Sequence, residues 1–183
     1  MYVLQKGNPK DESRLAREQE SYAFLDSLGI AYDRVDHEPH ATISACAEVD
    51  ALLGVRICKN LFLRNSNGSR YYLLLMPGDK PFRTKVLSAE IGSTRLSFAD
   101  AGAMEEMLGV TPGSVTVLGL MYDREHRVEL LIDREVLEEA YFACHPCINT
   151  SSIRFSTEEL LGKVLPALGH EAQIVTLAEG TEA

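Results

Sequence analysis

The apolar residues of this chain occur in short runs, and this feature limits its fold more than any other. The longest run, residues 71–77, has the length of a single β-strand. No stretch approaches the ~20 apolar residues that a helix needs to span a bilayer, so we expect no membrane partner. The first residues are followed at once by polar and charged ones, without the apolar stretch of a signal peptide, and we therefore expect a cytoplasmic protein.

Turn residues and apolar spacing predict a mixture of hairpins and helices. Strands are expected at 30–35, 56–64, 70–76, 114–121, 127–132, 141–143 and 173–177. Helices are expected at 11–28, 44–53, 82–91, 99–108, 135–139 and from the capping box at 156–159 to 168, and a loop is expected at 144–152. The 183 residues, 45% of them hydrophobic, suffice to bury a core, and no linker or repeat divides them. We therefore predict a single α+β domain over residues 1–183.

The net charge of −9 argues at first against a nucleic-acid partner, but the charges are unevenly distributed. Residues 54–95 contain eight basic and only two acidic side chains, a net charge of +6 that leaves −15 for the rest of the chain. Such a basic segment can be a binding surface for phosphates. It can equally consist of solvated charges on strand edges and loops, and the charge distribution alone favours neither interpretation.

Four cysteines raise the question of metal or redox chemistry. Cys144 and Cys147 have the CxxC spacing of zinc and thiol-redox sites. A structural zinc site needs four ligands, and the widely spaced Cys46 and Cys58 do not supply the second pair. Free thiols are the expected state in a cytosolic chain, so we expect no metal and no other cofactor. A zinc or thiol protein built on residues 144–147 stays an alternative.

Strong catalytic motifs are absent, because the sequence has no GxSxG, P-loop, GxGxxG or HExxH pattern. A weaker feature is Lys59, with Asn60 beside it, at the start of the apolar stretch 61–63. A lysine in this position often extends from a sheet edge to solvent. It can also be a fixed cation that faces a phosphate or a developing oxyanion.

Two loops are further candidates. The stretch 109–116 contains two glycines and a proline, and it is either a tight turn or a backbone loop that approaches a ligand closely. His145 shares a polar segment with Asn149 and Thr150. A lone histidine is often structural, but a loop that carries several polar groups is a better candidate for a site than a helix face.

These features occur in the same order in one known family. They are Lys-Asn-Leu-Phe-Leu at 59–63, Gly-Ser-Thr-Arg-Leu-Ser-Phe-Ala at 92–99, the turn at 109–116, and His145-Pro146 with Asn149-Thr150. Each is weak alone, whereas their joint order is specific. The chain resembles the trans-editing prolyl-tRNA deacylases, the YbaK-like or prolyl-tRNA synthetase insertion-domain-like family, in its free-standing alanine-specific branch. The resemblance covers a core of about residues 13–175 and implies a mixed, partly barrel-like β-sheet flanked by helices.

The resemblance also implies an activity: hydrolysis of the ester between a mischarged alanine and the terminal ribose of the proline tRNA. The partners it implies are the acceptor end of an aminoacyl-tRNA and, as a further candidate, prolyl-tRNA synthetase. The implied catalytic positions are Lys59, Gly113 and His145. The implied substrate-binding positions are Asn60, Arg95 for the acceptor end, Pro112, Ser114, Thr116, Asn149 and Thr150. The loop at 39–41 is expected to border the amino-acid pocket.

Other functions stay open at this point. Within the family, the substrate could be a cysteinyl-, seryl- or other small-amino-acid tRNA. From another class, the chain could be a non-catalytic module that binds tRNA or a synthetase. For an alanine-specific enzyme, steric exclusion of the bulkier proline ring is the more plausible device, since one methylene contributes only ~1–3 kcal/mol of preference.

Overall fold

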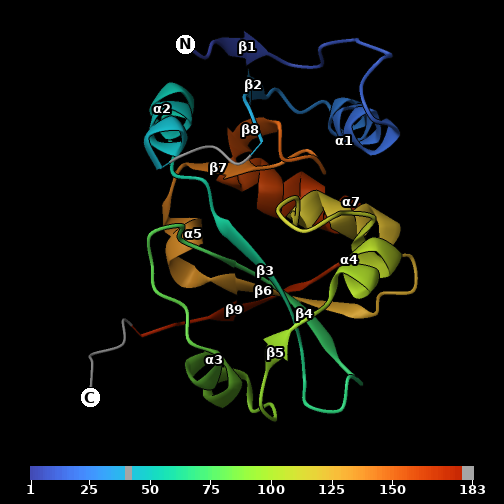
Figure 1. Cartoon of the computed structure of the whole chain (residues 1–183), viewed down its shortest axis with the longest axis vertical. Coiled ribbons are helices and arrows are strands. Elements are labelled where there is room, and N and C mark those ends of the chain that lie inside the picture. The colour runs from blue at the N-terminus through green and yellow to red at the C-terminus, as the bar shows by residue number, and fades with distance from the viewer. Residues whose placement is uncertain (40–42, 179–183) are drawn as a thin grey trace.

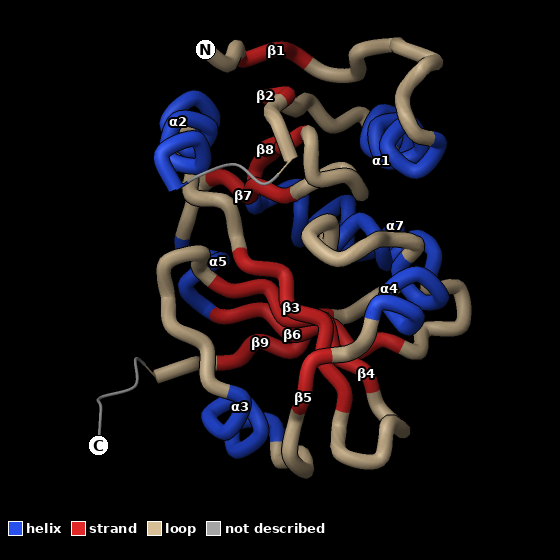
Figure 2. The backbone as a smooth tube through the Cα atoms, viewed as in Figure 1, coloured by secondary structure: helices blue, strands red, loops and turns tan. Residues whose placement is uncertain are grey.

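A computed structural model describes residues 1–39 and 43–178, which form two β-sheets with helices around them (Figures 1 and 2). The smaller sheet is antiparallel, in the order β1 (Leu4–Lys6), β2 (Asp33–Asp36), β8 (Ser151–Ser156) and β7 (Tyr141–Cys144). The larger sheet is mixed, in the order β5 (Ser97–Phe98), β3 (Lys59–Arg64), β4 (Tyr71–Met76), β6 (Val128–Asp133) and β9 (Ala172–Val175). The predicted α+β class with a mixed sheet is confirmed, although no closed barrel forms over the described ranges.

The helices are α1 (Ala16–Ser27), α2 (Ile43–Leu53), α3 (Thr84–Ile91), α4 (Ala101–Leu108), α5 (Arg134–Glu138), α6 (Thr157–Glu159) and α7 (Leu165–Leu168), with a π-helical turn over Leu160–Val164. Helices cover both faces of each sheet: α2 and α3 lie on the sides away from the main core, whereas α1, α4 and α7 contribute to that core (Figure 1). The capping predicted for the last helix is confirmed, since the Ser156 hydroxyl accepts a hydrogen bond from the Glu159 N–H. Within residues 1–39 and 43–178, every helix is too short or too polar to cross a membrane.

The central strand β4 explains why the longest apolar run of the sequence lies at 71–77. Leu73 and Leu75 face the main core, which they share with Phe142 and Ile153 of the smaller sheet. The alternate residues, including Leu74, point to the second core beneath α3. Because both faces of β4 are covered, its sequence is continuously apolar rather than alternating.

The smaller sheet also has two covered faces, and this arrangement positions the site. On one face, Val35 of β2 and Ala143 of β7 pack against Val49 of α2. On the other face, Ile153 of β8 belongs to the main core together with Tyr22 of α1. Successive residues of β2 and β8 therefore point alternately toward α2 and toward α1.

The predicted hairpin is present as β3 and β4, which pair from Lys59–Met76 to Arg64–Tyr71. The strand expected at 114–121 is wrong, because Val117–Tyr122 forms a 3-10 helix whose N-cap is Thr116. Its first four residues are fully or almost fully buried, and periodicity does not distinguish a buried helical run from a strand. The loop expected at 144–152 extends only to residue 150, since β8 begins at Ser151.

Candidate functional site

A cavity of about 580 Å³ lies between α2 and the adjoining edges of both sheets. Its lining residues come from segments that are far apart along the chain: His37 and Glu38; Cys46, Ala47, Val49 and Asp50; residues 56–59; Gly78 and Asp79; Gly113; and His145, Asn149 and Ser152. Three of the features singled out from the sequence meet here, since Lys59, Gly113 and His145 all line this one cavity. Asn149 lines it as well.

Lys59 is held at the start of β3 by a backbone contact. Its ammonium donates a hydrogen bond of 2.6 Å to the carbonyl oxygen of Lys80. The side chain of Lys80 is itself buried, with its Nζ 2.8 Å from Asp133 and 3.3 Å from Glu135, so this carbonyl is firmly anchored. An ammonium has three donors, and no described carboxylate pairs with Lys59. Two N–H donors of Lys59 are therefore available to a ligand.

Gly113 offers a second donor to the cavity. Its φ of +88° lies in the region that favours glycine. Among the residues that the structure describes, none accepts a hydrogen bond from the Gly113 N–H. A Cβ at this position would lie 3.7 Å from the Nδ2 of Asn149, which places the two loops side by side.

His145 is half-buried, and its imidazole has a defined hydrogen bond. Its Nδ1 lies 2.8 Å from the carbonyl oxygen of Ser151, which can only accept, so Nδ1 carries a proton. Burial lowers the pKa of His145 below its usual 6.5, against the opposing effect of the Ser151 hydrogen bond, and the charge of His37 lowers it further. The neutral ring is therefore favoured, and the lone pair of Nε2 has no partner within the described chain.

Sequence reasoning missed further polar groups of the cavity, among them His37 and Ser152. The Ser152 hydroxyl lies 2.8 Å from His37 Nε2 and 3.3 Å from His145 Nδ1, and it thus bridges the two rings, whose centroids are 5.9 Å apart. Only the pairing of β2 with β8 brings residue 37 next to residue 152. Because β8 was not predicted, the sequence carried no signal for this contact.

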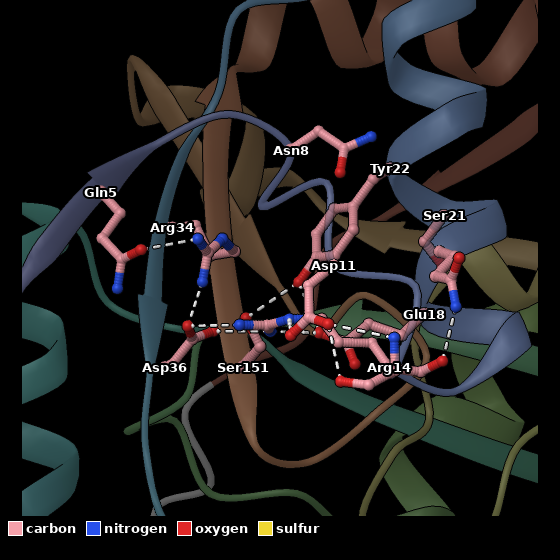
Figure 3. Close-up of polar contacts among 12 residues, drawn as sticks. Gln5, Asn8, Asp11, Arg14, Glu18, Ser21, Tyr22, Arg34, Asp36 and Ser151 are labelled. Carbon is pink, nitrogen blue, oxygen red and sulfur yellow. Dashed lines mark hydrogen bonds and ion pairs between the residues drawn. The ribbon is translucent and has the colours of Figure 1, made fainter.

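A largely buried polar network connects β2 and β8 with α1 and the residues just before it (Figure 3). Arg14, which lies just before α1, binds both carboxylate oxygens of Asp36, at 3.1 and 2.8 Å, and also binds Glu18 at 2.7 Å. The Tyr22 hydroxyl donates to Glu18 at 2.8 Å and lies 3.2 Å from the Ser151 hydroxyl. Asp36 and Ser151 directly precede His37 and Ser152, so alternate residues of β2 and β8 face the network and the cavity.

The charges of this network hold β2 in place. Arg34 also pairs with Asp36 and donates to the side chain of Gln5 at 2.7 Å (Figure 3). Burial acts to raise the pKa of Asp36, but hydrogen bonds from Arg14 and Arg34 outweigh it and lower that pKa to about 2. The carboxylate is therefore ionised throughout the physiological range.

The other predicted substrate-binding residues lie outside the lining of the cavity, which includes none of the following within the described ranges: Asn60, Arg95, Pro112, Ser114, Thr116 and Thr150. The Asn60 amide donates to the Cys58 carbonyl, and its buried Oδ1 has no described partner. Ser114 and Thr116 are buried, whereas Arg95 and Pro112 are exposed. The carbonyl of Thr150 accepts a hydrogen bond from the His37 N–H. Of the loop at 39–41, residues 40 and 41 lie outside the described residues.

The basic segment 54–95 is partly committed to ion pairs. Arg56 pairs with Asp79 and Glu139, Arg70 pairs with Glu129, and Lys80 is buried as described above. Arg83, Lys85 and Arg95 are exposed and form no ion pair within the described chain. These three cations remain available to phosphates.

The two thiols of the CxxC segment are unsuited to metal or redox chemistry. Cys144 and Cys147 are both fully buried, and burial raises the pKa of each, that of Cys147 to about 11. Over residues 1–39 and 43–178, no group of three or more histidine, cysteine or acidic side chains could hold a metal ion. The Nδ1 of His145 is also occupied by a backbone carbonyl.

Residues 37–162, more than half of the chain, match the model of the aminoacyl-tRNA editing domain. The prolyl-tRNA editing protein ProX of Acetoanaerobium sticklandii is 34% identical over 155 residues, which cover 85% of this chain and 94% of that protein. Prolyl-tRNA synthetase associated domain-containing protein 1 of Danio rerio is 31% identical over 141 residues, 75% of this chain and 76% of that protein. A solved structure described as a proposed trans-editing enzyme for prolyl-tRNA synthetase has the same fold, with a TM-score of 0.65, 17% identity, and coverage of 91% of this chain and 100% of that chain.

Proposed function

This chain belongs to the aminoacyl-tRNA editing domain family and is an aminoacyl-tRNA deacylase, and we propose that its substrate is alanyl-tRNA of the proline acceptor. The observation that carries the proposal is the convergence of Lys59, Gly113 and His145 on one cavity. The relatives named for prolyl-tRNA editing support the choice of the proline tRNA. The family resemblance of the sequence motifs supports the choice of alanine.

The cavity offers the groups that ester hydrolysis needs on the carbonyl side. As the tetrahedral intermediate forms, negative charge develops on the ester carbonyl oxygen, and fixed donors aimed at that position lower the barrier. Lys59 has two N–H donors without partners among the described residues, and the Gly113 N–H is also without one. We assign Lys59 and Gly113 to the carbonyl oxygen, or Lys59 to the neighbouring phosphate.

His145 is suited to handle the proton of the attacking water. Its neutral ring presents a lone pair on Nε2, which can accept one proton as the water oxygen bonds to the carbonyl carbon. When the bond between that carbon and the ribose oxygen breaks, the same proton passes to the ribose oxygen. The products are the free amino acid and a tRNA with its terminal hydroxyl restored, and His145 is again neutral.

The tRNA itself must also contact residues beyond the cavity. Asn149 lies beside Gly113 and is assigned to the terminal ribose. Arg95 precedes β5, which pairs with the end of β3 opposite Lys59, so we assign Arg95 to phosphates of the acceptor stem. Docking on prolyl-tRNA synthetase and a cytoplasmic location, where aminoacyl-tRNA is made, are part of the same proposal.

The decisive experiment is a deacylation panel on one tRNA. Proline tRNA is charged separately with alanine, serine, cysteine and proline, and the rate of ester loss above the uncatalysed rate is measured for each. We expect alanine to be removed fastest and proline to be spared, because the bulkier ring is excluded. Faster removal of serine or cysteine would overturn the choice of alanine. Tight tRNA binding without removal of any amino acid would instead indicate a non-catalytic module that binds tRNA.

A further inference from the structure

Among the carboxylates that line the cavity, Asp50 of α2 is the half-buried one, and no described side chain forms an ion pair with it. One of its oxygens accepts a hydrogen bond of 3.3 Å from the Ile57 N–H, and the other has no partner within the described chain. The fully buried aspartates behave differently, since each is paired with a basic side chain, as Asp123 is with His170 and Asp133 with Lys80.

The surroundings of Asp50 disfavour its charged form in the absence of a counter-ion. Next to it the cavity is lined by the apolar side chains of Ala47 and Ile57. Burial raises the pKa of Asp50, and the Ile57 N–H and the charge of Arg56 only partly oppose this. Arg56 is largely exposed and is paired with Asp79, so it is no dedicated partner for Asp50.

Lys59 does not fill this place either, because its ammonium forms no described ion pair with Asp50 and is bound instead to the carbonyl of Lys80. A half-buried carboxylate that lines a cavity and lacks a cation is a site for a cationic ligand group. The substrate of the proposed function carries such a group. The α-amino group of an aminoacyl ester is two bonds from the carbonyl carbon that Lys59 and Gly113 would address.

We propose that Asp50 binds the protonated α-amino group of the aminoacyl ester, an inference that rests on the proposed function. The substrate is then held at two points, its ammonium by α2 and its carbonyl by β3 and the loop at Gly113. This arrangement selects esters with a free amino group. Esters whose amino group is blocked, as in peptidyl-tRNA, lack the contact and are spared.

The test compares two esters of nearly equal size on proline tRNA. Alanyl-tRNA is converted chemically to lactyl-tRNA, in which a hydroxyl replaces the ammonium, and kcat/KM is measured for both, each relative to its uncatalysed rate. The variants are Asp50→Asn, which keeps an oxygen for the Ile57 N–H but removes the charge, and Glu38→Gln, which changes an exposed carboxylate of the same cavity. Thermal unfolding of each variant is recorded alongside.

The wild-type protein should prefer the alanyl ester, and Asp50→Asn should lower kcat/KM for that ester by about tenfold, the loss expected for one charge-assisted hydrogen bond. Its rate on the lactyl ester should stay close to the wild-type rate, so that the preference collapses, whereas Glu38→Gln should keep it. An equal loss on both esters, equal wild-type rates, or a collapse caused by Glu38→Gln would each overturn the assignment. If the wild-type protein hydrolyses neither ester, the proposed function is wrong, and the role assigned to Asp50 is wrong as well.

Discussion

The Nδ1 of His145 lies 2.8 Å from the carbonyl oxygen of Ser151, and this contact decides which ring nitrogen carries the proton. A carbonyl only accepts, so the proton stays on Nδ1 and the lone pair stays on Nε2. The hydroxyl of Ser152 reaches the same Nδ1 at 3.3 Å and links the ring to His37. The cavity therefore contains a histidine whose basic nitrogen is oriented before any substrate binds.

The pH dependence of deacylation should reveal this neutral histidine. Burial lowers the pKa of His145 below 6.5, and the facing His37 lowers it further. Since the neutral form is the active one, the catalysed rate should persist as the pH falls through 6.5 and decline only below the lowered pKa. Single-turnover rates measured from about pH 5 to 8, corrected for uncatalysed hydrolysis, check this. A half-maximal rate at or above pH 6.5 would contradict the assigned role.

Lys59→Ala should reduce deacylation while leaving the fold intact. The substitution removes the ammonium of a residue that lines the cavity, whose only described hydrogen bond is to the Lys80 carbonyl. The loss of one donor to a developing oxyanion lowers kcat by roughly 10²–10³-fold. Circular dichroism and single-turnover kinetics on alanyl-tRNA measure the two effects. Lys163→Ala, at an exposed lysine outside the basic segment 54–95, is the control, and wild-type kinetics in a well-folded Lys59→Ala protein would exclude Lys59 from the site.

The order of four short motifs predicted the family, and the comparisons confirm it. Helices with strong caps and the β3–β4 hairpin were predicted because their signals are local. The strand β8 was missed because its serines and Arg154 are polar yet largely buried, a consequence of pairing with β2 that no local pattern reveals. His37 was overlooked for the same reason, since only that long-range pairing brings it to Ser152.

Lys59, Gly113 and His145 could be selected from the sequence because the motifs that contain them occur together in the order of one family, although each is weak alone. Their placement in one cavity depends on the packing of α2 against the smaller sheet, which spacing alone does not predict. Arg95 belongs to one of the same four motifs, but it lies near the end of β3 that is opposite Lys59. Motif order therefore indicated which family the chain belongs to, but not which of its polar residues share the cavity.

Tyr22→Phe tests whether the network in Figure 3 positions His145. The change removes a hydroxyl that donates to Glu18 and lies 3.2 Å from the Ser151 hydroxyl. Tyr32→Phe is a matched control, because Tyr32 stacks on Tyr22 at 6.0 Å and its hydroxyl also binds a carboxylate, that of Asp26. Each variant should lose about 0.5–1.5 kcal/mol of unfolding free energy.

Only Tyr22→Phe should also lower kcat, by about tenfold with KM unchanged, since small displacements at a reacting group are costly. The ¹⁵N chemical shifts of the His145 ring provide a readout that stability does not affect. They should show Nδ1 protonated in the wild-type protein and a mixture of tautomers in Tyr22→Phe. Equal kcat losses in the two variants, with unchanged shifts, would limit the network to a structural role.

The carbonyl of Lys80 binds Lys59, and the side chain of Lys80 forms a buried ion pair with Asp133. Substitutions in this ion pair should strongly lower the stability of the protein. Both side chains are almost fully buried, with exposures of 4% and 1%, and their charged atoms are 2.8 Å apart. Lys80→Met leaves Asp133 with no cation at that position, and removing one partner of a buried pair costs about 3–5 kcal/mol of unfolding free energy. Adding Asp133→Asn should restore part of this loss, because the asparagine still accepts the Glu135 N–H but carries no charge. Urea unfolding of the two single variants and the double variant measures the coupling. If the losses of unfolding free energy in the two single variants simply add in the double variant, Lys80 and Asp133 have no favourable interaction with each other.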